Sequence, residues 1–520
     1  MPPTFHVENF GCRAARADGE AIASLLRSSG STESQPGQAD VVIVNTCSVT
    51  AEADREARAY IRHAHRLNPA ARIVATGCYA QRAPGELAGL PGVAAVIGNS
   101  HKALAPEIAL NLANSSASSR VDQAANSSAL VSGHDFSRAD RPAYATMPSA
   151  PENDSQIVSI ATLLAAAGNQ ALILAGDSFA HSFLEEAPIV PGVQTRPNLK
   201  IQEGCSNRCS FCVIPQTRGN SRSLAAESVL SHVRNFIQAG GNELVLSGIN
   251  LGCWGRDLNS QQSPVRTLAA LVRTILEHTN LRRLRLSSIE PMDWDADLIA
   301  LLRDFRGRLA RHAHLPLQSG SDSVLRRMYR RYRPWHYAEK VAELLAAAGS
   351  ALTLGADVMV GFPGETDHEF QESRNFIRSL PFGYLHLFPF SPRPGTRAWA
   401  LHAESPIPAA VREERMAEIR QLAAEKTRLH RAQLAGAELE AITLHTPSAA
   451  ALAGRTVALT DNFLPVDLEA SLPANHVVRI QVTGLAANGT LPASLISSTQ
   501  DEVPSISVSA GAESPLENAL

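Results

Sequence analysis

Three cysteines in one short loop constrain this chain more than any other feature. Cys205, Cys209 and Cys212 stand in the run GCSNRCSFCVIP, with C-x3-C-x2-C spacing, directly after the apolar stretch 199–201. Three thiolates from one tight loop can hold three irons of a [4Fe–4S] cluster and leave the fourth iron open to a substrate or cosubstrate. A structural zinc site needs a fourth ligand and usually shows paired C-x2-C units, and no second pair follows here. The spacing therefore favours an open iron–sulfur cluster over zinc.

Composition limits where such a chain works. Seven cysteines are scattered over 520 residues, and the N-terminal run MPPTFHVENFGC has no secretory pattern, so we expect a reducing cytoplasm rather than a disulfide framework. The most apolar stretch, 157–176, is interrupted by Gly-Asn-Gln, which argues against a membrane span. The net charge of -3 gives no global basic signature, so any contact with nucleic acid must come from local patches.

The first region, 3–102, alternates short apolar runs with helical patterns. Residues 41–44 and 72–75 predict buried strands, and 51–68 predict a helix between them, with Ser48 or Thr50 as its N-cap. Strands that alternate with helices indicate an open parallel sheet and an α/β domain.

Three further cysteines occupy equivalent places in this region. Cys12, Cys47 and Cys78 each follow directly after a predicted strand, at the edge where open parallel sheets build their binding sites. Single buried cysteines are common as structural residues, but that explanation does not account for the shared position. The pattern therefore predicts a second cluster held by three separate loops.

The middle region, 196–433, predicts a partial (β/α)6 barrel followed by a long charged helix at 409–433. Six predicted strands alternate with amphipathic stretches, at 199–202, 243–247, 283–287, 313–317, 352–359 and 384–388. Active residues of βα barrels lie at the carboxyl ends of the strands, and the Cys205 loop follows the first of them.

At this point the chain resembles a known family, the radical S-adenosylmethionine methylthiotransferases. The resemblance covers most of residues 5–400 and rests on FGCRAARADGEA, VIVNTCSVTAEAD, VATGCYAQ, LKIQEGCSNRCSFCVIPQTRGNSRS, LVLSGINLGCWGRD, RLRLSSIEP, HLPLQSGSDSVLRRM, DVMVGFPGETDHEF and FPFSPRPGT. The loop SGINLGCWG is most similar to the group that modifies threonylcarbamoyladenosine in tRNA. The isopentenyladenosine group typically has a Gln-Asn-Val type loop there, and the group acting on a ribosomal-protein aspartate a Gln-Asp-Thr type loop.

The resemblance implies two [4Fe–4S] clusters and S-adenosylmethionine as cofactors. It implies that the cofactor is split reductively, that the resulting 5′-deoxyadenosyl radical removes a hydrogen from carbon 2 of an adenine, and that sulfur and a methyl group follow. No catalytic residue beyond the six cysteines is expected. Residues placed by the resemblance to contact S-adenosylmethionine, each of which also has a simpler reading as a turn or cap residue, are Gly248, Asn250, Ser288, Glu290, Gln318, Asp357 and Gly361.

The implied substrate is an adenosine in a tRNA anticodon loop. Its base is already unpaired, so moving it into an active site costs little free energy. Basic residues that we expect near the barrel mouth as RNA contacts are Arg218, Arg222, Arg327 and Arg331, although charged runs are more often solvated helix faces. A low-potential electron donor such as flavodoxin or ferredoxin is implied, and we expect a monomer without a membrane partner.

The remaining segments are less informative. Residues 434–492 resemble the small β-barrel that ends this family (the TRAM domain), but only Arg455 and Arg479 are basic between 440 and 490, so the alternative is a module that merely packs on the barrel. Residues 103–195 form a long low-complexity linker, disordered at 111–153, and 493–520 read as a disordered tail. At 14–17 the chain has Ala-Ala-Arg-Ala where the family usually carries an Asn-Gln pair.

Three alternatives stay open from the sequence. Two are methylthiolation of isopentenyladenosine in tRNA and methylthiolation of a ribosomal-protein aspartate. The third, from another class, is a non-catalytic iron–sulfur protein that binds RNA or senses redox state, which would form no 5′-deoxyadenosine.

Overall fold

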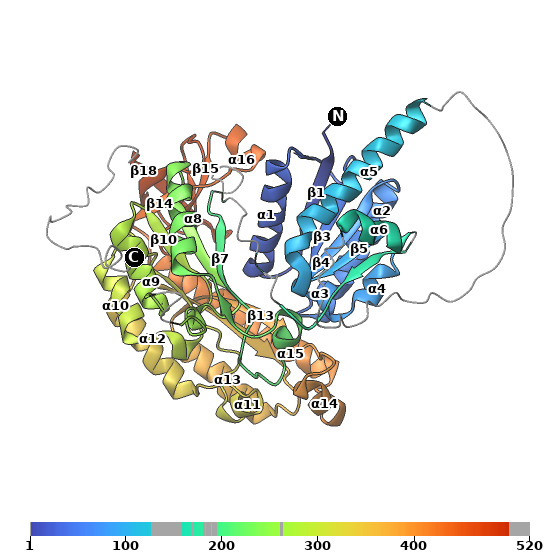
Figure 1. Ribbon diagram of the computed structural model, residues 1–520. Coiled ribbons are helices and arrows are strands. Elements are labelled where there is room, and N and C mark those ends of the chain that lie inside the picture. The colour runs from blue at the N-terminus through green and yellow to red at the C-terminus, as the bar shows by residue number, and fades with distance from the viewer. Residues whose placement is uncertain are drawn as a thin grey trace.

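The computed structural model arranges the chain as two α/β units and a small closed β-barrel (Figure 1). It describes residues 2–125, 159–168, 170–179, 183, 189, 195–259 and 264–498. The tail expected at 493–520 therefore lies largely outside the described residues, as does most of the segment expected to be disordered at 111–153.

The N-terminal unit is a six-stranded sheet in the order β2-β1-β3-β4-β5-β6, in which every pairing is parallel. Its strands are β1 (Thr4–Asn9), β2 (Thr32–Glu33), β3 (Val41–Thr46), β4 (Arg72–Gly77), β5 (Val93–Gly98) and β6 (Leu172–Leu174). All six residues of β3 are buried because α1 (Arg13–Ser28) and α5 (Ala105–Ala125) pack on one face of the sheet and α2 (Ala51–Leu67) on the other. Thr50 caps α2, as the sequence predicts, by accepting a hydrogen bond from the backbone N–H of Ala53.

The sixth strand corrects the expected linker at 103–195. Strand β6 comes from within that segment and pairs with β5, and α6 (Ile160–Ala167) places Ile160 in the same apolar core as Leu174. Helix α5 also continues well into the segment. A three-residue strand in an Ala- and Leu-rich stretch carries too little periodicity to be recognised from sequence, so its membership of the sheet was missed.

The middle unit is the expected partial barrel of six parallel strands, with the strands in two hydrogen-bonded groups. They are β7 (Asn198–Glu203), β9 (Glu243–Gly248), β10 (Arg283–Leu286), β11 (His312–His314), β12 (Thr353–Val360) and β13 (Phe382–Pro389). A backbone bridge between Leu284 and Leu309 joins the two groups, and β8 (Arg222–Ser223) adds a short antiparallel edge beside β7.

Helices cover the outer face of this barrel and share one large apolar core with it. They include α8 (Ala226–Gln238), α9 (Leu268–His278), α10 (Ala296–Asp304), α11 (Asp322–Arg327), α12 (Pro334–Ala348), α13 (Asp367–Ser379), α14 (Arg397–Glu404) and α15 (Ala409–Ala432). Helix α11 ends at Arg327, and Tyr329 just beyond it adopts a left-handed backbone conformation, with φ of 59°. Within the described ranges, no helix has both the length and the apolar character that crossing a bilayer demands.

The C-terminal barrel closes in the order β14-β15-β16-β18-β17 and docks against the amino-terminal ends of the larger barrel's strands. Its strands are β14 (Glu438–Thr443), β15 (Thr456–Thr460), β16 (Pro465–Leu468), β17 (Val477–Val482) and β18 (Leu491–Ser498). Arg311 pairs with Asp461 at 2.6 Å across the contact. The module's own Arg455 and Arg479 are engaged by Asp467 and Glu438, which favours a packing role over phosphate binding.

Candidate functional site

Three loops of the N-terminal sheet bring Cys12, Cys47 and Cys78 to one edge. Cys12 lies between β1 and α1, Cys47 follows β3, and Cys78 opens α3 (Cys78–Arg82) directly after β4. The three strands β1, β3 and β4 are neighbours in the sheet. The loops are tightly packed: a Cβ on Gly11 would lie 2.6 Å from the Cβ of Cys47, and Gly11 has a φ of +107°. Only glycine fits both constraints.

The three thiols influence one another electrostatically. Burial raises the pKa of Cys47 to about 12, and Cys78 and Cys12 add to the effect. A buried thiol with such a pKa becomes a thiolate only beside a strong compensating positive charge, which bound iron supplies. This donor set, three cysteines without a disulfide, fits a cluster with one open iron.

Polar groups surround the innermost of these cysteines. Nε of Arg218 lies 3.1 Å from Sγ of Cys78, and Nδ2 of Asn99 lies 3.4 Å from it. Oδ1 of Asn99, Oγ1 of Thr217 and Nη2 of Arg218 are buried and have no hydrogen-bond partner. Buried polar atoms are rarely left unpaired in native proteins, so these atoms mark a site that another group completes.

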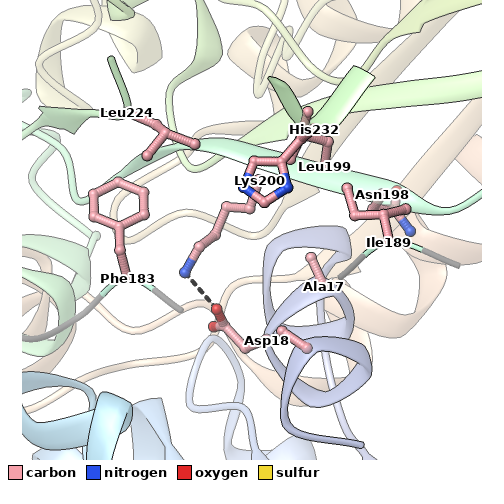
Figure 2. A pocket seen from close by; sticks show the side chains of 10 residues that line it. Ala17, Asp18, Phe183, Ile189, Asn198, Leu199, Lys200, Leu224 and His232 are labelled. Atoms are coloured by element: carbon pink, nitrogen blue, oxygen red, sulfur yellow. Dashed lines mark hydrogen bonds and ion pairs between the residues drawn. The ribbon is translucent and has the colours of Figure 1, made fainter. Parts of the chain in front are cut away.

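Arg218 belongs to a fully buried ion network that joins the two α/β units. Asp18 and Lys102 come from the N-terminal unit, and Lys200 and Glu203 come from β7. Nη1 of Arg218 lies 3.2 Å from Oδ2 of Asp18. Figure 2 shows Lys200 reaching from β7 to Asp18 on α1, beneath Phe183, which belongs to the segment 103–195. Burial opposes the charge of Arg218, but Cys78, Glu203 and Asp18 outweigh it and raise its pKa well above the usual value.

The second set of cysteines lies in the loop after β7. The backbone N–H of Cys205 donates to the carbonyl of Gly219 at 3.0 Å, which closes the loop on itself. Burial raises the pKa of Cys205, and it raises the pKa of Cys212 to about 12, with Cys209 and Cys205 contributing to the latter. The donor set therefore fits the same kind of open cluster.

Arg330, which the sequence did not single out, lies against this second set. Nη1 of Arg330 is 3.2 Å from Sγ of Cys209, and the same guanidinium pairs with Glu290 and stacks on the ring of Tyr332. Burial opposes its charge, but Tyr332, Glu290 and Cys209 raise the pKa of Arg330 well above its usual value. The left-handed Tyr329 turns the chain so that Arg330 points inward, and no periodic pattern signals this.

One cavity extends from the cysteine loop of the barrel to the chain segment just after Cys47. Val49 and Thr50, which follow Cys47, line it from the N-terminal unit, and Cys212, Gln318 and Asp357 line it from the barrel. Oε1 of Gln318 is buried there without a hydrogen-bond partner. An unpaired buried amide oxygen beside a cluster loop fits the polar groups of S-adenosylmethionine.

The other residues expected at the cofactor divide into two groups. Asn250 remains near the cluster, since its Nδ2 lies 3.7 Å from Sγ of Cys205 while its Oδ1 is buried without a partner. Gly248 ends β9, and Ser288 is half-buried just beyond β10. Glu290 instead engages Arg330, and the backbone N–H of Gly361 donates to Glu365 in a turn that packs against Arg412, so the structure gives these two positions other contacts.

Asp357 is the centre of a group that we did not anticipate. Its Oδ1 lies 3.1 Å from Nε2 of His314 and 3.3 Å from Nδ1 of His386. Burial disfavours ionisation of Asp357, but these two histidines outweigh it and hold the pKa of the carboxyl below its usual range. His314 also shares a hydrogen bond with Tyr384, so one carboxylate orients a connected polar group on the inner barrel wall.

The four arginines expected to contact RNA differ in how exposed they are and in which residues they contact. Arg218 is fully buried, so the expectation of an RNA contact is wrong for it. Arg222 is half-buried and stacks on Phe179, and Arg327 is held by both oxygens of Glu369 at 2.8 Å. Arg331 is exposed and pairs with Asp293 at 2.9 Å.

The spacing of the thiols bears on the choice of metal. Among the described residues, only one group of three histidine, cysteine or acidic side chains has its metal-binding atoms within 4.8 Å of one another. That group consists of His314, Asp357 and His386. Two thiolates on one zinc ion, each about 2.3 Å from it, lie about 4 Å apart in tetrahedral geometry. In the part of the chain that the structure describes, neither cysteine set has its three sulfurs within 4.8 Å of one another.

Comparisons with known proteins agree with this geometry. Residues 4–98 match the uncharacterized protein family UPF0004, and residues 199–377 match the radical SAM superfamily. The chain is 32% identical to the threonylcarbamoyladenosine tRNA methylthiotransferase MtaB of Bacillus subtilis, over 89% of each chain. It is 30% identical to the protein of that name from Aquifex aeolicus, over 91% of this chain and 99% of the relative.

Relatives that match a smaller share of the chain carry a related name. The tRNA-2-methylthio-N(6)-dimethylallyladenosine synthase of Geobacter metallireducens is 30% identical over 76% of this chain and 77% of its own length. Among solved structures, the radical S-adenosylmethionine methyltransferase TsrM of Kitasatospora setae covers 78% of each chain at 14% identity, with a TM-score of 0.47, a likeness too weak to bear on function. With two cysteine sets that fit [4Fe–4S] clusters and relatives that match nearly the whole chain, this protein belongs to the radical S-adenosylmethionine methylthiotransferases.

Proposed function

We propose that the protein adds a methylthio group to carbon 2 of N6-threonylcarbamoyladenosine next to the anticodon of tRNA. The relatives that match it over about nine-tenths of its length carry this substrate in their names. The dimethylallyladenosine relatives match a smaller share of the chain, which makes their substrate the second candidate. Membership of an enzyme family leaves no support for the alternative of a non-catalytic RNA-binding or redox-sensing protein.

The observation that carries the proposal is the shared cavity. Sulfur insertion at an unactivated carbon needs the radical source and the sulfur source at one substrate atom, because proximity supplies much of the rate. Residues next to Cys47 and Cys212 itself line the same space, so a base held there lies between both cysteine sets. The reductive step and the sulfur chemistry are supplied by the bound clusters and S-adenosylmethionine.

The chain's own side chains would position and shield these groups. The cluster ligands in this proposal are Cys12, Cys47 and Cys78 in one set and Cys205, Cys209 and Cys212 in the other. Asn250 and Gln318, each with an unpaired amide oxygen, are the cofactor contacts that their surroundings support best, with Asp357, Ser288 and Gly248 along the same strand ends. Arg218 and Arg330 hold one thiolate of each set and exclude water from it.

Organisation and partners follow from this activity. We propose three functional parts: the auxiliary-cluster domain from residue 3, enlarged by β6; the barrel and its trailing helix at 196–433; and the docked β-barrel, expected at 434–492 and extended by β18 to Ser498. A flavodoxin- or ferredoxin-type donor, a monomeric state and a cytoplasmic site of action suit an enzyme that needs low-potential electrons and tRNA. Arg222, Arg327 and Arg331 remain the proposed RNA contacts, of which Arg331 is the most accessible.

A reconstituted reaction tests the proposal. The reduced protein, loaded with iron and sulfide, is incubated with S-adenosylmethionine and an anticodon stem-loop that carries either threonylcarbamoyladenosine or isopentenyladenosine. We expect 5′-deoxyadenosine and the methylthio product with the first RNA. Methylthio product with the second RNA alone would show that isopentenyladenosine, and not threonylcarbamoyladenosine, is the substrate. Formation of 5′-deoxyadenosine without methylthio product on either RNA would point to a protein substrate.

A further inference from the structure

Arg13, the residue after Cys12, has an unusual environment. Its side chain is half-buried, and its Cζ lies 5.3 Å from the ring centroid of Phe463 in the C-terminal barrel. It makes no hydrogen bond or ion pair with any residue that the structure describes. A partly desolvated cation without a partner is costly unless a ligand supplies the counter-charge.

The charge around Arg13 is already positive. Arg285 faces the same ring, with its Cζ 5.2 Å from the centroid of Phe463. Glu243 is the acidic group that acts on Arg13, but it is shared among three other arginines, namely Arg196, Arg283 and Arg285. Tyr384 is the remaining neighbour from the barrel wall. Glu440 also pairs with Arg283, but it is shared with Arg282. Two carboxylates therefore face five guanidinium groups, and the remaining positive charge favours an anion in this part of the barrel.

A series of side-chain contacts runs from this positive region to Asp357 in the lining of the cavity. The ring of Tyr384 lies 5.1 Å from that of His386, and His386 contacts Asp357, which lines the cavity. Arg13 also adjoins Cys12 in the chain, so its backbone lies beside the proposed sulfur source. When carbon 2 of the adenine lies at this sulfur source, the substituent on N6 points away from the sulfur source and towards the inner wall of the barrel.

We propose that Arg13 binds the carboxylate of the threonylcarbamoyl group and thereby distinguishes this substrate from isopentenyladenosine. The inference rests on the proposed function and names the residue that would read the substrate. Arginine suits the task because its planar fork meets a carboxylate through two hydrogen bonds. An isopentenyl group is neutral and would leave the guanidinium buried and unpaired, so the same residue would select against it.

The test compares binding of three anticodon stem-loops of identical sequence by fluorescence anisotropy. They carry threonylcarbamoyladenosine, its methyl ester, or unmodified adenosine, and the protein is the full-length, cluster-loaded chain at fixed salt. For the unchanged protein we expect about tenfold tighter binding of the free carboxylate than of the ester. Because this comparison changes only the RNA, it does not depend on whether any variant folds. Equal affinity for both would overturn the inference.

Variants then locate the contact. Arg13→Gln is expected to bind the carboxylate and ester loops equally, and Arg13→Lys to restore part of the preference. The matched control is Arg16→Gln, one turn further along α1, where the exposed side chain pairs with Glu20; it should keep the full preference. If Arg13→Gln weakens all three RNAs alike, Arg13 binds a phosphate and the inference is wrong. If the unchanged protein makes no methylthio product on the threonylcarbamoyl loop, the proposed function itself fails.

Discussion

Nε of Arg218 lies 3.1 Å from Sγ of Cys78, and the same fully buried guanidinium pairs with carboxylates from both α/β units. Arg330 stands in the same relation to Cys209 at 3.2 Å. Each proposed cluster site thus has one buried arginine on one of its sulfurs. Such contacts stabilise thiolate charge and exclude water, and they tie the geometry of each site to an ion network rather than to the loop alone.

Replacing Arg218 with Met tests this relationship. The change would leave Asp18 and Glu203 buried with less compensation, so we expect a loss of unfolding free energy on the order of 3 kcal/mol. Chemical denaturation measures that loss, and the iron content should fall to about half because one site is weakened. Arg222→Met is the control, since Arg222 is only half-buried and stacks on Phe179. Unchanged stability and iron content in Arg218→Met would show that the network is dispensable.

The two cysteine sets should separate in function. Replacing Cys209 with Ala is expected to abolish formation of 5′-deoxyadenosine, because the site that splits S-adenosylmethionine loses a ligand. Replacing Cys47 with Ala should spare that cleavage and stop methylthio product formation. Chromatography of both products in one reaction makes the measurement. Full product from the Cys47 variant would rule out a second cluster on the N-terminal domain.

Glu243 should make a pH-dependent contribution to stability. Burial opposes its ionisation, but Arg285, Arg283 and Arg196 outweigh it and lower the pKa of Glu243 to about 2 from 4.5. A carboxyl with a depressed native pKa stabilises the fold above pH 4.5 and loses that contribution as the pH falls towards 2. The contribution is at most about 3 kcal/mol.

The difference in unfolding free energy between the unchanged protein and Glu243→Gln should therefore be largest near neutral pH and shrink below pH 4.5. The control is Glu227→Gln, at an exposed position on α8, which should show little difference at any pH. A Glu243 difference that stays constant across this range would mean that the pairing does not depend on ionisation.

Substitutions of Arg331 and Arg327 should have different effects on tRNA binding. Arg331 is exposed, so Arg331→Gln should weaken tRNA binding and make the dependence of log affinity on log salt less steep by about 0.7, the effect of one lost phosphate contact. Arg327 is already held by Glu369, so Arg327→Gln should leave the salt dependence as it is. Identical salt slopes for Arg331→Gln and the unchanged protein would remove Arg331 from the interface.

The sequence predicts the fold here because its signals are local. Apolar runs such as 41–44 identify strands, and a parallel sheet then places Cys12, Cys47 and Cys78 at one edge without further information. The corrections concern contacts between distant segments. Strand β6 is too short to show a period, and the burial of Arg218 depends on Asp18 and Glu203, which lie far from it in the chain.

The same limit explains the residues that were missed. Arg330 lies in a run of arginines whose composition indicates a solvated face, and only the left-handed turn at Tyr329 directs it towards Cys209. His386 and Asp357 come from neighbouring strands, so their contact requires the register of β12 with β13, in which these two residues are paired directly. Sequence patterns give neither the register nor the turn.

Mass spectrometry of nucleosides in tRNA from cells with and without this gene tests the central claim most directly. We predict that loss of the gene removes the methylthio form of threonylcarbamoyladenosine, that the unmodified parent accumulates, and that the unchanged gene restores the product while the Cys47→Ala version does not. An unchanged level of that nucleoside in cells without the gene would contradict the account. Loss of the methylthio form of isopentenyladenosine instead would support the methylthiolation reaction but would show that isopentenyladenosine is the substrate.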